Sequence, residues 1–144
     1  MNSLKNNLIP YSFLLFAFLG FVDSTFLAVL HYKNITPPCT ITQGCEKVLT
    51  SQYATINEIP IAVLGSIYFT VLIILGILLL QNNKKWLKKA ILIFTSMGMV
   101  VALILLYIQL VILQALCQYC FLVELILFLL FWASIKVYFS SSSR

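Results

Sequence analysis

The amino-acid sequence predicts an all-α membrane protein, a bundle of four transmembrane helices with a functional outer loop between the first and second helices. Hydrophobic residues make up 62% of the chain and charged residues only 9%, whereas soluble domains carry roughly 25% charged residues. Several apolar runs approach or exceed the ~20 residues that a helix needs to cross a bilayer. The net charge of +5 comes largely from one short segment between two runs and from the termini, a pattern typical of topology signals rather than of nucleic-acid binding.

The first apolar run covers about residues 11–30 and predicts the first span. A cleaved signal peptide is the alternative, but the run is long for that role and lacks a clear small-residue cleavage site. The polar stretch 32–59 follows as the outer loop, and the second span covers about 60–80. This loop is long enough to carry function.

The chain then stays apolar from residue 90 to about residue 135. As one helix this run would measure about 69 Å at ~1.5 Å per residue, more than twice the thickness of the hydrocarbon layer. It must therefore fold back on itself. Its polar interruptions lie between Gln109 and Gln118, so we expect a tight turn near 113–116 and two spans, at about 90–112 and 117–138. Residues 1–144 then form one integral membrane domain.

Orientation follows from the basic segment at residues 81–89, which contains four lysines and is expected on the cytoplasmic side. An even number of spans then places both termini inside as well. Seven of the nine Lys and Arg residues, Arg144 among them, would lie inside, and only Lys33 and Lys47 outside. The outer loop and the turn before Cys117 both face the outer compartment.

All four cysteines fall on that outer face, as the pairs Cys39/Cys45 and Cys117/Cys120. A Cys-x-x-Cys at the start of a helix holds two sulfurs one turn apart, and the helix N-terminus stabilises the thiolate of the first cysteine. A disulfide between residues one turn apart constrains little, so its expected use is electron transfer. Two alternatives stay open: inert disulfides that staple an exported loop, and a zinc site of four thiolates, which this spacing fits poorly.

The positions of the two pairs suggest a division of labour. Cys39 and Cys45 lie in an aqueous loop where a protein can dock, whereas Cys117 and Cys120 lie at the edge of the bilayer. Thiol–disulfide exchange between the pairs would carry two electrons from one to the other. A membrane quinone is the commonest lipid-soluble molecule that could accept or donate these electrons at the Cys117/Cys120 pair.

Four segments, in order along nearly the whole chain, resemble the vitamin K epoxide reductase family. They are Val29-Leu30-His31-Tyr32-Lys33, then Cys39-x5-Cys45-x2-Val48-x2-Ser51-x-Tyr53, then Ile59-Pro60-Ile61-Ala62-Val63-Leu64-Gly65, and finally Cys117-x-x-Cys120. No single motif is decisive, but the four together in this topology are specific.

The resemblance implies a four-helix bundle around a quinone, which would be menaquinone, ubiquinone or a vitamin K-like molecule. Cys120 would contact the quinone ring, and Cys117 would exchange with a loop cysteine, for which Cys45 is the expected one. Cys39 and Cys45 would then shuttle electrons to or from a separate thioredoxin-like, DsbA-like protein, because the chain has no room for such a domain after Tyr138.

Further site residues are also implied by the resemblance. Ser51 matches a loop serine or threonine that hydrogen-bonds near the quinone oxygen, and Cys45, Val48 and Ser51 would share one face of a short helix. Gly65 and Glu124 complete the expected quinone-binding set with Cys120 and Ser51. Animal members of the family have a tyrosine where this chain has Glu124, so recognition of vitamin K itself does not follow.

Asp23 lies in the first span beside Ser24 and Thr25. An ionisable residue inside a span is a functional candidate, but polar neighbours of this kind favour a local polar contact.

The sequence thus predicts a quinone-dependent thiol–disulfide oxidoreductase that couples oxidation of a partner's cysteines, with disulfide formation, to reduction of a membrane quinone. The alternatives are a DsbB-type disulfide oxidase of another lineage, in which the Cys-x-x-Cys lies on the first outer segment, and a non-catalytic membrane subunit with structural disulfides. The compact chain without a retention signal favours a bacterial plasma membrane over the endoplasmic reticulum.

Overall fold

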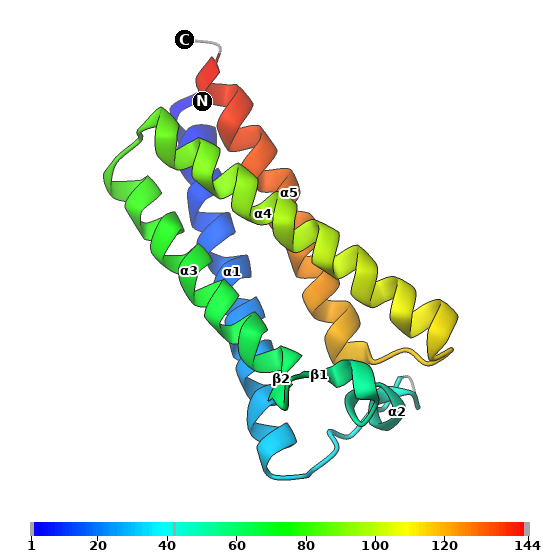
Figure 1. Ribbon diagram of the computed structural model, residues 1–144. Coiled ribbons are helices and arrows are strands. Elements are labelled where there is room, and N and C mark those ends of the chain that lie inside the picture. The colour runs from blue at the N-terminus through cyan, green and yellow to red at the C-terminus, as the bar shows by residue number, and fades with distance from the viewer. Residues whose placement is uncertain (1, 42, 143–144) are drawn as a thin grey trace.

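The computed structural model describes residues 2–41 and 43–142. Within these residues the long elements are the helices α1 (Asn2–Tyr32), α3 (Ile61–Gln81), α4 (Lys85–Tyr107) and α5 (Gln118–Ser142). They lie side by side as a bundle (Figure 1), and four helices of the described chain are long and apolar enough to cross a membrane. The predicted all-α fold of four membrane helices is therefore confirmed.

Two helices begin earlier than the apolar runs suggested. α1 already starts at Asn2, before the first span expected at 11–30, and α4 starts at Lys85 rather than near residue 90. Lysine is a good helix former, and its long side chain can reach water from the end of a membrane helix. Charge therefore ends the apolar run in the sequence without ending the helix.

The third span does not stop at Tyr107. It continues through a π-helix (Ile108–Ile112), and an irregular turn follows from Leu113 to Cys117 before α5 begins. π-helical turns are uncommon and occur often at functional sites. The chain thus reverses direction in the region where the sequence suggested a tight turn.

The segment between α1 and α3 forms a small structured layer at one end of the bundle (Figure 1). It contains α2 (Cys45–Leu49), a 3₁₀ turn (Gln52–Ala54), and the antiparallel strands β1 (Thr55–Ile56) and β2 (Ile59–Pro60). The positive φ angles of Asn57 and Glu58 are typical of the two-residue turns that join antiparallel strands. This segment is called the outer loop below.

Small and aromatic residues hold the first pair of helices together. A Cβ atom on Gly20 of α1 would overlap the ring of Phe69 in α3, and one on Gly76 would crowd Leu14. Small residues that let helices approach closely are the usual basis of helix association in a membrane, where water supplies no hydrophobic drive. Phe69 is almost fully buried as a result.

A polar contact joins α4 to α5. Thr95 and Ser134 are both buried, and their hydroxyl oxygens lie 2.8 Å apart in a hydrogen bond. Many large apolar side chains of all four long helices point outward instead, as expected for a surface that faces lipid.

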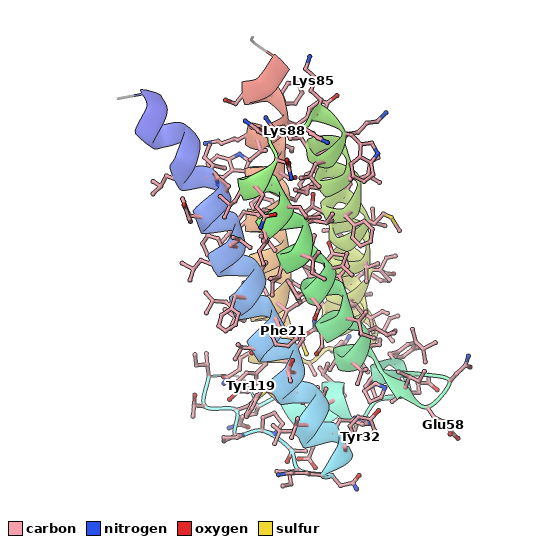
Figure 2. The ribbon with its side chains drawn as sticks, turned by 90° about the vertical axis from the view of Figure 1, so that its left-hand side faces the viewer. Phe21, Tyr32, Glu58, Lys85, Lys88 and Tyr119 are labelled. Carbon is pink, nitrogen blue, oxygen red and sulfur yellow. A yellow bond between two sulfur atoms is a disulfide. The ribbon has the colours of Figure 1, made fainter. Side chains whose placement is uncertain are left out.

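The two ends of the bundle differ in character. Lys85 and Lys88 lie at one end, and Tyr32, Glu58 and Tyr119 lie at the other (Figure 2). The start of α1 and the end of α5 share the lysine end, while the outer loop and the start of α5 share the opposite end (Figure 1). The cysteines of the outer loop and those beside α5 are therefore brought to the same end.

Candidate active site

The Cys-x-x-Cys motif occupies the start of α5. The carbonyl of Cys117 accepts a hydrogen bond from the N–H of Phe121 at 2.9 Å, so Cys117 takes the N-cap position, just before the span that begins at Gln118. Its sulfur accepts a hydrogen bond from the N–H of Cys120 at 3.4 Å. Hydrogen bonds from the thiol of Cys120 and from the amides of Cys120 and Tyr119 lower the pKa of Cys117, against the opposing effect of burial. Cys117 and Cys120 are free thiols, and Cys117 is the better placed to become a thiolate.

The loop cysteines form a disulfide, Cys39–Cys45. Cys45 opens α2 and is 1% exposed, whereas Cys39 remains partly exposed. Cys45, Val48 and the fully buried Cys117 form one cluster, and Cys39 and Cys120 pack against it. The two pairs predicted from the sequence are thus gathered into one group, with Cys45 next to the start of α5.

The residues between the two cysteines of the motif hold the outer loop in place. The side-chain oxygen of Gln118 accepts a hydrogen bond from the N–H of Ile41 at 3.1 Å, and the hydroxyl of Tyr119 donates one to the carbonyl of Pro38 at 3.3 Å. Gly44 lies against the backbone of Leu116, where any side chain would overlap the turn. The sequence does not predict these contacts, because each one joins segments far apart along the chain.

A cavity of about 710 Å³ lies beside this group, lined by parts of all four long helices and by the outer loop. The residues expected to bind a cofactor all line it, namely Ser51, Gly65, Cys120 and Glu124. Among the four cysteines only Cys120 lines the cavity. The rest of the wall is largely apolar, with residues such as Leu27, Phe69, Phe94 and Leu127.

Glu124 and Gln109 form a buried polar network behind the motif. The amide nitrogen of Gln109 donates a hydrogen bond to Oε1 of Glu124 at 2.7 Å, and the amide oxygen of Gln109 accepts one from the N–H of Cys117 at 3.1 Å. Oε2 of Glu124 is buried and has no hydrogen-bond partner among the residues that the structure describes. The sequence pattern indicates Gln109 only as a polar interruption of the apolar run. An amide inside a membrane helix is itself a signal that points to a role.

Comparison with models of protein families decides to which family the chain belongs. The vitamin K epoxide reductase family matches residues 11–135. The chain belongs to this family. A comparison with proteins of curated function finds no match. The matched region includes all four cysteines and all the residues that line the cavity. Membership of this family decides against a DsbB-type oxidase of another lineage.

As a member of the vitamin K epoxide reductase family, the protein is a multi-pass membrane oxidoreductase with two cysteine pairs. Family membership and the cysteine pairs together suggest thiol–disulfide chemistry. The disulfide of the outer loop is an oxidised cysteine pair, and the two thiols at α5 are a reduced one. Thiol–disulfide exchange passes two electrons between two such pairs.

One local expectation for this family member needs correction. Ser51 does not share a helical face with Cys45 and Val48, since α2 ends at Leu49. The hydroxyl of Ser51 donates a hydrogen bond to the carbonyl of Val48 at 2.7 Å, and serine side chains that bond nearby carbonyls compete with continuation of a helix. Ser51 reaches the cavity from the segment after the helix instead.

Asp23 also differs from the expectation. In the described part of α1 it forms no hydrogen bond with Ser24 or Thr25; Thr25 pairs with Ser66 of α3, with 3.2 Å between the oxygens. Oδ2 of Asp23 is buried without a partner. The carboxyl group lies near enough to Cys117 and Cys120 to interact with them electrostatically.

The described residues contain no group of three or more His, Cys, Asp or Glu side chains that could hold a metal ion. Two of the four sulfurs that a zinc site would need are joined in the Cys39–Cys45 disulfide.

Proposed function

We propose that this enzyme oxidises the cysteine pair of a separate thioredoxin-like, DsbA-like protein and passes the two electrons to a membrane quinone. The observation that carries the proposal is the order of the cysteines. Cys39 is partly exposed, Cys45 is buried with Cys117, and Cys120 lines an apolar cavity. Electrons that a partner protein donates at Cys39, on the aqueous side, would thus leave from Cys120, next to a space suited to an apolar ring.

The proposed path consists of two thiol–disulfide exchanges. The partner's two thiols reduce the Cys39–Cys45 disulfide and become a disulfide themselves. The loop thiols then reduce a Cys117–Cys120 disulfide, with Cys45 attacking Cys117, and the loop disulfide forms again. Each exchange moves two electrons and conserves the number of thiols and disulfides. The arrangement described above, with an oxidised loop and free Cys117 and Cys120, corresponds to the stage that follows the second exchange.

The residues around the cavity fit a quinone. Ligand sites are mostly apolar with a few polar groups that fix orientation, and here Ser51, Cys120 and the unpartnered Oε2 of Glu124 are such groups. A quinone bound there would accept two electrons and two protons. Gly65, which also lines the cavity, lies close to Ser24, so the wall has little room for a side chain at that position. Menaquinone, ubiquinone and vitamin K-like quinones share the ring chemistry that this site would recognise.

We also propose that the lysine end faces the cytoplasm and the cysteine end the outer compartment. The exposed side chains of Lys84, Lys85 and Lys89 support this orientation, because cytoplasmic loops carry an excess of positive charge. Arg144, which contributes to the same count, lies outside the described residues. An oxidising outer compartment agrees with a bacterial plasma membrane, which remains the proposed location.

A quinone-coupled assay tests the proposal. Purified protein is mixed with a reduced thioredoxin-like substrate and a short-chain quinone, and loss of substrate thiols is compared with formation of quinol. We expect one substrate disulfide for each quinol, and neither product without the enzyme. If the cysteines instead form fixed disulfides and no quinol appears, the protein is the non-catalytic subunit with stapled loops.

A further inference from the structure

Glu124 occupies an unusual position for a carboxyl group. It lies four residues after Cys120 on α5, so both side chains share one face of the helix, and both line the cavity. Glu124 is only 8% exposed, and its Oε2 is buried with no hydrogen-bond partner in the described part of the chain. An unsatisfied buried oxygen lowers the stability of a protein, because it loses its hydrogen bonds to water and gains none in return. A carboxyl group retained inside a membrane helix at that cost is a candidate for function.

Gln109 determines how this carboxyl group is held. It is 3% exposed, and both ends of its side-chain amide are used, one by Oε1 of Glu124 and the other by the N–H of Cys117. The backbone carbonyl of Gln109 accepts a hydrogen bond from the N–H of Ala115 at 3.0 Å, which fixes the π-helix against the turn. Gln109 therefore occupies Oε1 and leaves Oε2 as the free oxygen, while it ties Glu124 to the active-site cysteines.

We propose that Glu124 transfers a proton between the Cys120 thiol and a quinone oxygen in the cavity, and that Gln109 is the positioning residue for this transfer. The inference rests on the proposed function, because it assigns a role within the quinone step. It goes beyond binding, since it requires the acidic proton of Glu124 and not only its shape.

The atoms and electrons balance with the two reactants already named. When Cys117 and Cys120 form a disulfide, their two S–H bonds break and they lose two electrons and two protons. Conversion of a quinone to a quinol takes up two of each. Glu124 gives one proton to a quinone oxygen and regains one from Cys120, so it ends unchanged. The proton of Cys117 is exchanged with water at the outer end and balances the second proton of the quinol.

Other titratable groups near the cavity are less suited to this role. His31, Tyr53 and Tyr68 also line it, but each lies on another element and none is hydrogen-bonded to the network that reaches Cys117. Asp23 on α1 is a second carboxyl group that interacts with Cys117 and Cys120, but it does not line the cavity. Glu124 combines a position on the cavity with a place one turn from Cys120.

The decisive variant is Glu124→Gln, which can still accept the hydrogen bond from Gln109 but has no acidic proton. Two matched variants accompany it. Asp23→Asn removes the carboxyl group of α1 that interacts with Cys117 and Cys120. Glu58→Gln makes the same chemical change as Glu124→Gln at an exposed position in the turn between the strands (Figure 2). Gln109→Met keeps the carboxyl group but removes its partner.

Four quantities are measured on each purified protein. The first is the rate at which a small dithiol reduces the Cys117–Cys120 disulfide without quinone, and the second is the affinity for a short-chain ubiquinone. The third is the rate at which that quinone oxidises the reduced protein, measured as a function of pH. The fourth is the infrared difference spectrum between the disulfide and dithiol forms without quinone. The last measurement reports on carboxyl groups and does not depend on turnover.

For Glu124→Gln we expect unchanged dithiol reduction and little loss of quinone affinity, because the amide of Gln can donate a hydrogen bond to a quinone oxygen in place of the carboxyl group. Oxidation by quinone should be about a hundredfold slower or more, the usual contribution of a positioned proton donor. The pH inflection of that rate and one carboxyl band of the difference spectrum should disappear. Gln109→Met should shift the inflection and the band without removing them. Asp23→Asn and Glu58→Gln should retain both.

Several results would overturn the proposal. A wild-type rate of quinone oxidation in Glu124→Gln would do so, as would loss of quinone affinity or dithiol reduction together with that rate, because Glu124 would then be a binding or packing residue. Loss of the inflection in Asp23→Asn alone would assign the proton to Asp23. If the wild-type protein accepts electrons from the dithiol but never reduces a quinone, the proposed function itself fails, and that outcome is distinct from the others.

Discussion

Gly44 lies directly against the backbone of Leu116: a Cβ atom on Gly44 would come within 2.6 Å of the Leu116 carbonyl oxygen and 2.7 Å of its nitrogen. This contact packs the start of α2, where Cys45 lies, against the turn that leads to Cys117. Gly44 has an ordinary backbone φ of −93°, so the close approach, and not a special conformation, requires a residue without a side chain.

Gly44→Ala is expected to move α2 away from this turn. Backbone shifts forced by overpacking cost about 1–3 kcal/mol, so exchange between the loop and Cys117 should slow by roughly tenfold. Reduction of the Cys117–Cys120 disulfide by a small dithiol should be unchanged, since that reaction does not need the loop. Rates with a protein substrate and with a small dithiol measure the two effects separately. Equal rates for the variant and the wild type with the protein substrate would mean that the contact is not needed for exchange.

Replacement of Cys39 or Cys45 by Ala should stop oxidation of a protein substrate and leave turnover with a small dithiol largely intact. The reason is that a small reductant can reach Cys117 without the loop relay. Quinol formation with each reductant is the measurement. If both activities fall by the same factor, the loop disulfide has a structural role only.

Cys120→Ala should abolish quinone reduction and accumulate mixed disulfides through Cys117. Cys120 lines the cavity and Cys117 does not, so loss of Cys120 blocks the transfer to quinone. The Cys117 thiolate can still attack Cys45 in the Cys39–Cys45 disulfide and release the Cys39 thiol, and no Cys120 thiol is present to resolve the mixed disulfide. Non-reducing gels with mass spectrometry of the trapped species identify the linked cysteine. A trapped mixed disulfide in Cys117→Ala, and none in Cys120→Ala, would reverse the two roles.

The proposed orientation can be tested with two reporters in a cysteine-free background. Glu58→Cys and Lys85→Cys lie at opposite ends of the bundle (Figure 2) and both positions are exposed. A membrane-impermeant thiol reagent added to intact cells should label the reporter at residue 58 and not the one at residue 85. The opposite labelling would invert the topology and place the cysteines in the cytoplasm.

Thr95→Val should destabilise the bundle only slightly. The hydrogen bond between Thr95 and Ser134 joins α4 to α5, and such bonds in membrane proteins contribute on average about 0.6 kcal/mol and at most about 1.7 kcal/mol. Thr70→Val is the matched control, because Thr70 is exposed and bonds only to the carbonyl of Ser66 in its own helix. Unfolding in mixed micelles gives both free energies. A loss of several kcal/mol in Thr95→Val alone would show that the contact is worth more than membrane hydrogen bonds usually are.

Composition and the lengths of the apolar runs were enough to predict four membrane helices. The reason is physical: a bilayer accepts only segments of one length class whose backbone groups are satisfied internally. The same argument required the long apolar run after residue 90 to turn back. Helix ends were less predictable, because lysines interrupt an apolar run but not a helix, as the start of α4 at Lys85 shows.

The cysteine pairs could also be identified from their spacing and their common end of the bundle. The network of Gln109 and Glu124 could not, nor could the contact between Gly44 and Leu116, because each depends on how distant segments pack. Spacing along one helix relates Cys120 to Glu124, but it says nothing of which side chain on another segment meets them.

The sequence by itself determined the membrane class, the number of spans and the residues able to carry redox chemistry, since these follow from hydropathy and residue type. Only the tertiary structure decided which cysteine meets which. It buries Cys45 with Cys117, and it brings Cys120 to the cavity while leaving Cys117 out of its wall. The physical reason is that thiol exchange and proton transfer act over a few ångströms, a distance set by the packing of the outer loop and the π-helix against α5 and not by position in the chain.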